Sequence, residues 1–224
     1  EPGTITLEDG PTLTSTVNAT LQKEMEKFIV AHKPKEAAFV AVNPKTGEIL
    51  ALVGYADGDL EPYRALQAKG PAASIFKLVT AAALVESAGV SPNENVCFHG
   101  GKNGINAKHL QFDPKRDKSC ETLAQAIGHS TNVVLGRLAS QNLKRGDYTN
   151  WLDRFFFNRR IPFYWPVEMS RSSVPKDKLG QATLAAGFSN TTLSPLHAAL
   201  LTAAIANDGV MMSPRVVKQV VDGE

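Results

Sequence analysis

A serine and a lysine three residues apart, Ser74 and Lys77 in "GPAASIFKLVTA", could carry out nucleophilic chemistry. The apolar run after Ser74 predicts a helix over 74–89, and residues at i and i+3 share one face of a helix. A serine hydroxyl is a poor nucleophile until a base takes its proton. Lysine can be that base where burial and the positive end of the helix dipole lower its pKa. The competing interpretation is that Ser74 only caps the helix.

A second polar group, Ser130-Thr131-Asn132 in "GHSTN", stands at a predicted break between two helical stretches. Such a turn could aim a hydroxyl that passes a proton to a leaving amine and an amide that grips a substrate peptide group. Alternatively, Ser130 caps the helix that follows. Chance alone yields about one Ser-x-x-Lys match in a chain of this composition. The other match, Ser173-Lys176, contains Pro175 and is predicted to lie in a loop.

The apolar patterns around these residues predict an α/β fold rich in helix. Two apolar runs, 37–42 and 48–55, flank the turn "NPKTG" and predict a β-hairpin. Both faces of these strands are apolar, so helices should cover both sides. Residues 1–16 are polar with Pro and Gly, which predicts a linker, and residues 17–224 form the domain. Further predicted elements are a helix between a cap at Asn18 and a stop at Pro34, a helical stretch over 121–143 that is interrupted near 128–132, and a helix over 151–157. A last helix begins after Pro195 and ends at Asn207-Asp208-Gly209, and a strand follows over 215–221.

Composition excludes several classes of protein. The chain has 224 residues, 43% of them hydrophobic, and a net charge of +2. This length supports a sizeable core. The weak, scattered charge argues against a nucleic-acid partner, and no apolar run approaches the ~20 residues that span a bilayer. A membrane contact would therefore come only through an anchor outside these residues.

The two cysteines, Cys97 and Cys120, lie 23 positions apart and are disulfide candidates. An oxidising compartment would join them, and loop-closure entropy would then stabilise the fold by roughly 3 kcal/mol. Two free thiols and a zinc site that includes His99 and His109 are the alternatives. The spacing matches no regular zinc signature, so we expect no metal and no cofactor.

Four stretches together resemble the transpeptidase domain of the high-molecular-mass penicillin-binding proteins, in the serine acyl-transferase superfamily that includes the serine β-lactamases. They are "AAFVAVNPKTGEILALVGY", "SIFKLVTAAALVESAGV", "TLAQAIGHSTNVVLGRLA" and "AAGFSNTTLSPLHAALLTAAIANDGVMMSPRVV". The motif order makes the match specific: Ser-x-x-Lys, then Ser-x-Asn, then a helix that begins with Ser-Pro-Leu. The resemblance implies the β-lactamase/transpeptidase-like α/β fold, an antiparallel sheet flanked by helices.

The resemblance also implies roles for the site residues. Ser74 would be the acylated nucleophile, Lys77 its base, Ser130 the proton shuttle and Asn132 a ligand for the substrate backbone. The implied partners are D-alanyl-D-alanine stem peptides of peptidoglycan, β-lactam antibiotics and other cell-wall synthesis proteins. The implied location is extracytoplasmic, in the periplasm or on the outer face of the cytoplasmic membrane, with the anchor upstream.

Two departures from the family pattern qualify this inference. Ala73 stands where such domains commonly have glycine before the nucleophile. The family's Lys-Thr/Ser-Gly strand should follow the Ser-Pro-Leu helix, whereas Lys45-Thr46-Gly47 precedes Ser74 and is interpreted as a turn. We therefore expect the functional triplet and the last strands beyond Glu224, and weak or no penicillin labelling of these residues alone. A β-lactamase, a β-lactam sensor and a non-catalytic scaffold of the same fold remain alternatives.

Overall fold

The computed structural model of the chain describes residues 2–6, 11–101 and 103–221. These residues form two compact units. The first, here called the sheet unit, comprises Glu1–Ala68, Arg160–Met169 and Ser194–Glu224. The second, called the helical unit, comprises Lys69–Arg159 and Ser170–Leu193.

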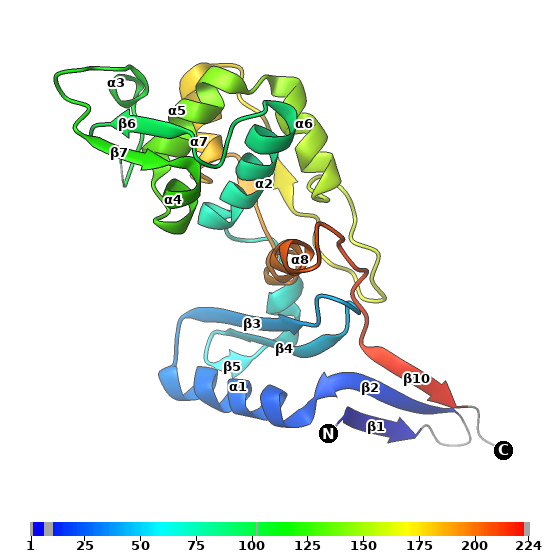
Figure 1. The fold of residues 1–224 in the computed structure, drawn as a ribbon. Coiled ribbons are helices and arrows are strands. Elements are labelled where there is room, and N and C mark those ends of the chain that lie inside the picture. The colour runs from blue at the N-terminus through cyan, green and yellow to red at the C-terminus, as the bar shows by residue number, and fades with distance from the viewer. Residues whose placement is uncertain (1, 7–10, 102, 222–224) are drawn as a thin grey trace. The chain divides into compact units, whose positions relative to one another are not determined.

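The predicted hairpin forms the centre of the sheet unit. Strands β3 (Glu36–Val42), β4 (Ile49–Ala56) and β5 (Asp59–Leu60) make an antiparallel sheet in that order. Helix α1 (Ala19–His32) packs against β4, and helix α8 (Pro195–Ala206) packs against β3. Figure 1 shows these helices on opposite sides of the sheet, so the expectation that helices cover both faces is confirmed.

Side-chain alternation along β4 explains why both faces need cover. Leu52 is buried in a cluster with Leu196 and Leu200 of α8. Its neighbour Val53 packs with Ile29 of α1. Successive strand residues point to opposite faces, so a strand that is apolar at every position requires a helix on each side.

The triplet Lys45-Thr46-Gly47 lies in the turn between β3 and β4. The Asn43 side-chain oxygen accepts the backbone N–H groups of Lys45 (2.9 Å) and Thr46 (3.3 Å). Gly47 adopts φ +73°, and a Cβ there would lie 2.2 Å from the Ser213 carbonyl oxygen. Glycine is therefore required at this position by backbone conformation and close approach, as the interpretation of a turn predicts.

Residues 2–6 and 12–16 form strands, whereas the sequence predicts a linker over 1–16; residues 1 and 7–10 of that predicted linker lie outside the described residues. Strand β2 (Thr12–Asn18) lies between β1 (Pro2–Thr6) and β10 (Val217–Val221) in an antiparallel sheet, with Leu13 opposite Val220. The threonines and apolar residues of β2 favour extended backbone. Its partner β10 comes about 200 residues later in the sequence, so the local pattern carries no sign of the pairing.

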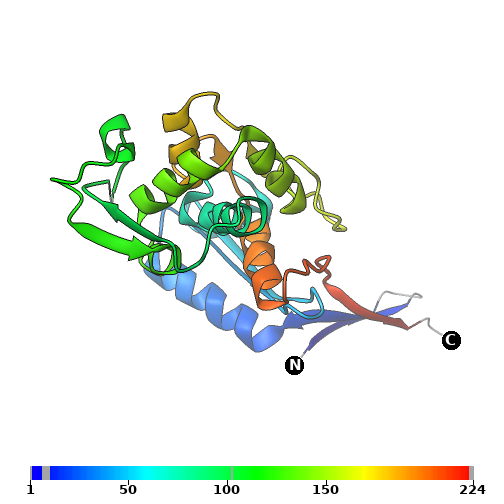
Figure 2. The same ribbon diagram turned by 45° about the horizontal axis from the view of Figure 1, so that its top comes forward.

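The helical unit surrounds the helix that begins near Ser74. That helix starts as a 3₁₀ turn (Ala73–Phe76), continues as α2 (Lys77–Ala82) and ends as a π-helical turn (Ala83–Ser87). Helices α4, α5 and α6 contact α2, which lies among them in Figures 1 and 2. The remaining elements are α3 (Ala107–Leu110), α4 (Leu123–Gly128), α5 (Asn132–Asn142), α6 (Arg145–Arg154), α7 (Lys178–Ala185), and the strand pairs β6 (Asn95–Phe98) with β7 (Ser119–Thr122) and β8 (Arg171–Ser172) with β9 (Thr191–Thr192).

Candidate active site

Ser74 lies inside the first helical turn and does not cap it. The residue at the N-cap position is Ala72, and no side chain caps this turn. Ala73 adopts φ +46°, a left-handed conformation that is uncommon for residues other than glycine. The cap interpretation is therefore wrong, and the hydroxyl of Ser74 contacts Lys77 and Ser130 instead.

The Lys77 ammonium group contacts the other three predicted site residues. Its Nζ lies 3.2 Å from Ser74 Oγ and 2.7 Å from Ser130 Oγ. It also donates to the Ser130 carbonyl oxygen at 2.8 Å and to Asn132 Oδ1 at 2.5 Å. Lys77 is only 2% exposed, and burial lowers its pKa from 10.5 to about 8. The charged form is disfavoured because the site removes it from water.

Ser130 lies in the sharp turn between α4 and α5. Its φ is +58°, and its Oγ donates a hydrogen bond to Ser74 Oγ at 2.9 Å. Thr131, rather than Ser130, holds the N-cap position of α5, so the alternative that Ser130 caps this helix is wrong. Left-handed backbone at a residue other than glycine costs of order 1–3 kcal/mol and is concentrated at functional sites.

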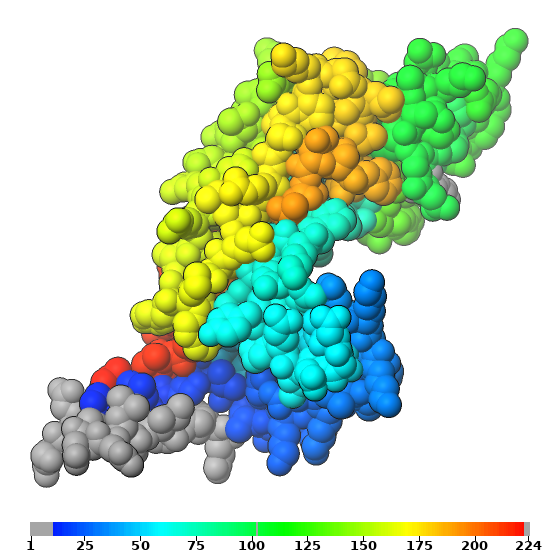
Figure 3. All heavy atoms as spheres, turned by 180° about the vertical axis from the view of Figure 1, so that it is seen from behind, coloured from blue at the N-terminus to red at the C-terminus, as the bar shows by residue number. Residues whose placement is uncertain are grey.

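A glycine far away in the sequence fixes the backbone beside the serine. Gly187 adopts φ +83°, and a Cβ there would lie 1.8 Å from the Ala73 carbonyl oxygen. Nearby, Thr191 Oγ1 accepts the N–H of Ala72 at 3.1 Å, and the N–H of Leu193 donates to the Gly70 carbonyl at 2.9 Å. From behind, orange spheres near residue 190 touch cyan spheres near residue 70 (Figure 3).

This role of Gly187 is not visible in the sequence. The residue follows the end of α7, where glycine is common as a helix terminator. Nothing local marks its contact with a residue 114 positions earlier. Gly187 is the glycine of "AAGFSN" (185–190), and its positive φ lets this loop approach Ala73 closely.

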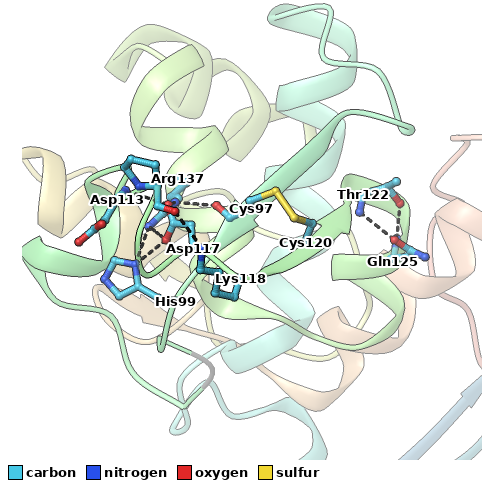
Figure 4. Close-up of a disulfide and its surroundings, with 10 residues drawn as sticks. Cys97, His99, Asp113, Asp117, Lys118, Cys120, Thr122, Gln125 and Arg137 are labelled. Atoms are coloured by element: carbon cyan, nitrogen blue, oxygen red, sulfur yellow. Dashed lines mark hydrogen bonds and ion pairs between the residues drawn. A yellow bond between two sulfur atoms is a disulfide. The ribbon is translucent and has the colours of Figure 1, made fainter.

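The cysteines are paired in the helical unit. Cys97 of β6 lies opposite Cys120 of β7, and a disulfide joins them. Their sulfurs are therefore not available to zinc or as free thiols. His99 instead contacts the carboxylate of Asp117, with Nδ1 2.5 Å from Oδ1 (Figure 4). Among the described residues, no group of three or more His, Cys, Asp or Glu side chains is arranged to hold a metal ion.

Arg137 of α5 is the buried centre of this region, although no sequence motif marks it. Its guanidinium contacts both carboxylate oxygens of Asp117, at 2.7 and 3.1 Å, and is 2% exposed. This hydrogen bonding holds the pKa of Asp117 well below its usual range. The guanidinium also donates to the backbone carbonyls of Cys97, His109 and Gln111. Because α5 begins at Asn132, this network ties the 97–120 segment to the helix that carries a site residue.

The arrangement has the groups needed for covalent catalysis. Once Lys77 loses its proton, its amine can accept the proton of the Ser74 hydroxyl as Oγ attacks a carbonyl carbon. The Ser130 hydroxyl contacts both groups and can carry a proton to a leaving nitrogen. All four predicted residues meet within hydrogen-bond distance around one ammonium group.

Known proteins of one family match most of the chain. Residues 37–224 match the family described as "Penicillin binding protein transpeptidase domain". Stage V sporulation protein D of Bacillus subtilis is 23% identical over 94% of this chain and 34% of its own length. Penicillin-binding protein PbpB of Mycolicibacterium smegmatis is 25% identical over 95% of this chain and 35% of its own length. The chain thus spans about a third of these relatives.

Solved structures confirm the predicted fold class. The ceftriaxone acyl-enzyme complex of penicillin-binding protein A from M. tuberculosis superposes with a TM-score of 0.76 at 24% identity. The matched region covers 93% of this chain and 54% of the chain in that structure. The D,D-transpeptidase domain of a peptidoglycan glycosyltransferase from Eggerthella lenta gives a TM-score of 0.75 at 23% identity, covering 95% of this chain and 59% of that one. In the described part of the chain, the helices are all too short or too polar to cross a bilayer.

Proposed function

Since the chain belongs to the family of penicillin-binding protein transpeptidase domains, we propose that it carries the acylation centre of a peptidoglycan D-alanyl-D-alanine transpeptidase. The observation that carries this proposal is the convergence of Ser74, Ser130 and Asn132 on the buried Lys77 ammonium. In this proposal Ser74 is the nucleophile, Lys77 the general base, Ser130 the proton shuttle and Asn132 the ligand of the substrate backbone.

The reaction begins when neutral Lys77 accepts the Ser74 proton. Oγ attacks the carbonyl carbon between the two D-alanines and forms a tetrahedral intermediate. The C–N bond then breaks, and Ser130 delivers a proton to the departing D-alanine nitrogen while Lys77 re-protonates Ser130. An amine of a second stem attacks the acyl ester, loses one proton to the site, and releases Ser74 with its hydroxyl restored.

A β-lactam enters the same first step with a different outcome. Attack on the lactam carbonyl opens the ring, so the leaving nitrogen stays tethered to the acyl group. The acyl-enzyme then persists, because the bound product blocks the approach of an acceptor. Penicillin-binding protein A, whose solved structure resembles this chain, forms such an acyl-enzyme with ceftriaxone.

The Cys97–Cys120 disulfide supports an extracytoplasmic location for this activity. Disulfides persist in oxidising compartments and are rare in the cytosol of mesophiles. Peptidoglycan stem peptides lie outside the cytoplasmic membrane, so the proposed location and the proposed substrate agree. An upstream membrane anchor and contacts with cell-wall synthesis proteins are further parts of this proposal.

The test is covalent labelling of the complete protein with a fluorescent penicillin, followed over time. We expect stable label that is lost in Ser74→Ala and kept in Ser173→Ala, since Ser173 belongs to the exposed second Ser-x-x-Lys pattern. Label that forms and then clears rapidly would instead indicate a β-lactamase. Absence of label would indicate a non-catalytic relative and would contradict the proposal.

A further inference from the structure

Ala73, the residue before the nucleophile, has an unfavourable backbone conformation. Its φ of +46° lies in the left-handed region, which costs free energy for a residue that carries a Cβ. Such a residue keeps this conformation only where the surrounding structure imposes it. The direction of Ser74 Oγ toward Lys77 and Ser130 depends on this backbone, because Ala73 directly precedes the nucleophile. The contacts that impose the conformation therefore also position the nucleophile.

The first turn of the helix cannot supply these contacts from its own capping positions. In a capping box, the backbone N–H of the N-cap residue is bound by a side chain three residues later. The N-cap position belongs to Ala72, and the residue three positions later is Ile75, whose side chain cannot accept a hydrogen bond. The acceptor comes instead from strand β9, 119 positions away in the sequence, where Thr191 Oγ1 accepts the Ala72 N–H at 3.1 Å.

The hydrogen bond between Ala72 and Thr191 is buried. Ala72 is 2% exposed and Thr191 is 8% exposed. A buried N–H that loses its acceptor cannot be satisfied by solvent, so this backbone would have to move to find another acceptor. Thr191 is itself paired with Ser172 of β8, so its hydroxyl is carried by a strand pair.

Two further hydrogen bonds hold the segment that carries Thr191 against the same helix. The Leu193 N–H donates to the Gly70 carbonyl oxygen at 2.9 Å, just before the helix begins. The buried hydroxyl of Thr80, on α2, donates to the Ala185 carbonyl oxygen at 2.8 Å. All of these residues belong to the helical unit. The acceptor for the Ala72 N–H is therefore fixed relative to the helix that carries the nucleophile.

We propose that Thr191 is a positioning residue for acylation. Its hydroxyl holds the backbone of Ala72 and Ala73 in the conformation that directs Ser74 toward its base. In this role Thr191 acts through the alanine backbone and not on the substrate, and the proposal rests on the function proposed above. Loss of the hydroxyl should let Ala73 return to a favoured conformation and displace Ser74 Oγ. A displacement near 1 Å can slow a reaction by about 100-fold.

The test compares the same isosteric change at two neighbouring positions of β9. Thr191→Val removes the acceptor for the Ala72 N–H. Thr192→Val is the matched control, since Thr192 Oγ1 also accepts a backbone N–H, that of the exposed Arg171, at 3.2 Å. The complete protein is labelled with a fluorescent penicillin at several concentrations, which separates the maximal acylation rate from the dissociation constant of the penicillin.

We expect Thr191→Val to lower the maximal acylation rate by about ten-fold or more, with the dissociation constant unchanged. Thr192→Val should leave both values unchanged, and Thr191→Ser, which keeps a hydroxyl, should retain the unmodified rate. A Thr191→Val variant that labels as fast as Thr192→Val, or a Thr191→Ser variant as slow as Thr191→Val, would overturn the proposal.

Two readouts separate positioning from a loss of stability. A variant that is only less stable labels a smaller fraction of the protein, but its folded fraction labels at the unmodified rate. The second readout uses Ala73→Gly, because glycine adopts a positive φ without strain. The slowing by Thr191→Val should therefore be smaller in the Ala73→Gly background. A smaller labelled fraction at an unchanged rate, or the same slowing in both backgrounds, would contradict the positioning role.

Amide hydrogen exchange tests the same contact without penicillin. The peptide that contains Ala72 should exchange faster in Thr191→Val than in Thr192→Val, because its N–H has lost a buried acceptor. Equal exchange in the two variants would overturn the role of Thr191. If the unmodified protein takes no label, the proposed function fails, and the exchange experiment still decides whether Thr191 holds this backbone.

Discussion

Lys77 is the residue whose protonation state should set the rate of acylation. Burial lowers its pKa from 10.5 to about 8. At pH 7 a group of pKa 8 is neutral about 10% of the time, against about 0.03% for an ordinary lysine, which is a gain of about 300-fold in available base. Because only the neutral amine can take the Ser74 proton, we expect acylation to rise about ten-fold between pH 7 and pH 9 and to level off above pH 8.

The assay is the initial rate of fluorescent-penicillin labelling of the complete protein from pH 6 to pH 9.5. The perturbation is Lys77→Arg, which keeps a positive charge but cannot lose it near neutral pH. General bases contribute about 100- to 10,000-fold, so labelling should fall by at least about 100-fold. Lys176→Arg is the matched control, since Lys176 belongs to the exposed second Ser-x-x-Lys pattern.

Two results would refute this account of Lys77. One is a labelling rate that stays flat across pH 7 to 9 in the unmodified protein. The other is a Lys77→Arg variant that labels as fast as Lys176→Arg. Either would mean that another group takes the Ser74 proton and that the short contacts of Nζ only fix the positions of Ser130 and Asn132.

Three further predictions follow from contacts outside the catalytic cluster. Gly187→Ala should slow labelling by about 100-fold, because the new Cβ meets the Ala73 carbonyl and a displacement near 1 Å can cost that much. Replacing Cys97 and Cys120 by serine should lower the free energy of unfolding by about 3 kcal/mol in a urea titration, since it opens a loop with a sequence separation of 23. The pKa of Asp117 is lowered in the folded protein, so its carboxylate stabilises the fold above about pH 4 and this stabilisation is lost as the pH falls further. In Asp117→Asn the free energy of unfolding should therefore fall less steeply below pH 4.

Each of these predictions has its own control. Gly89→Ala places a methyl group at φ +66° with no atom within 4 Å, so it should strain the backbone without slowing labelling. If the two glycine variants label at the same rate, Gly187 does not fix the backbone beside Ser74. If the double serine variant has an unchanged urea midpoint, the disulfide contributes little to stability. If Asp117→Asn leaves the pH dependence of the free energy of unfolding below pH 4 unaltered, the Asp117 carboxylate contributes little.

The sequence was most informative where interactions between neighbouring residues determine where a helix begins or ends. The apolar run after Ser74, the break before Asn132 and the proline at the start of α8 each mark an element boundary that lies close to the observed one. In these stretches, hydrophobic period, turn chemistry and caps all act over a few residues. The Ser-x-x-Lys and Ser-x-Asn residues meet because both motifs start helices of the same unit.

What the sequence did not reveal depends on contacts between distant positions. The residues of strand β2 look like a linker in sequence because their partner β10 comes about 200 residues later. Arg137 carries no local signal because its three carbonyl partners and Asp117 lie 20 to 40 positions earlier in the sequence, in β6, α3 and the segment that follows α3. Charged side chains are mostly exposed, so a buried guanidinium is visible only once its partners are placed.

The proposed function requires that Ser74 itself becomes acylated. Its most direct test is peptide mass mapping after the complete protein has reacted with benzylpenicillin. We expect a single adduct of one penicillin mass on the peptide that contains Ser74, and none on the peptide that contains Ser130. An adduct on Ser130, on another residue, or on no peptide at all would contradict it.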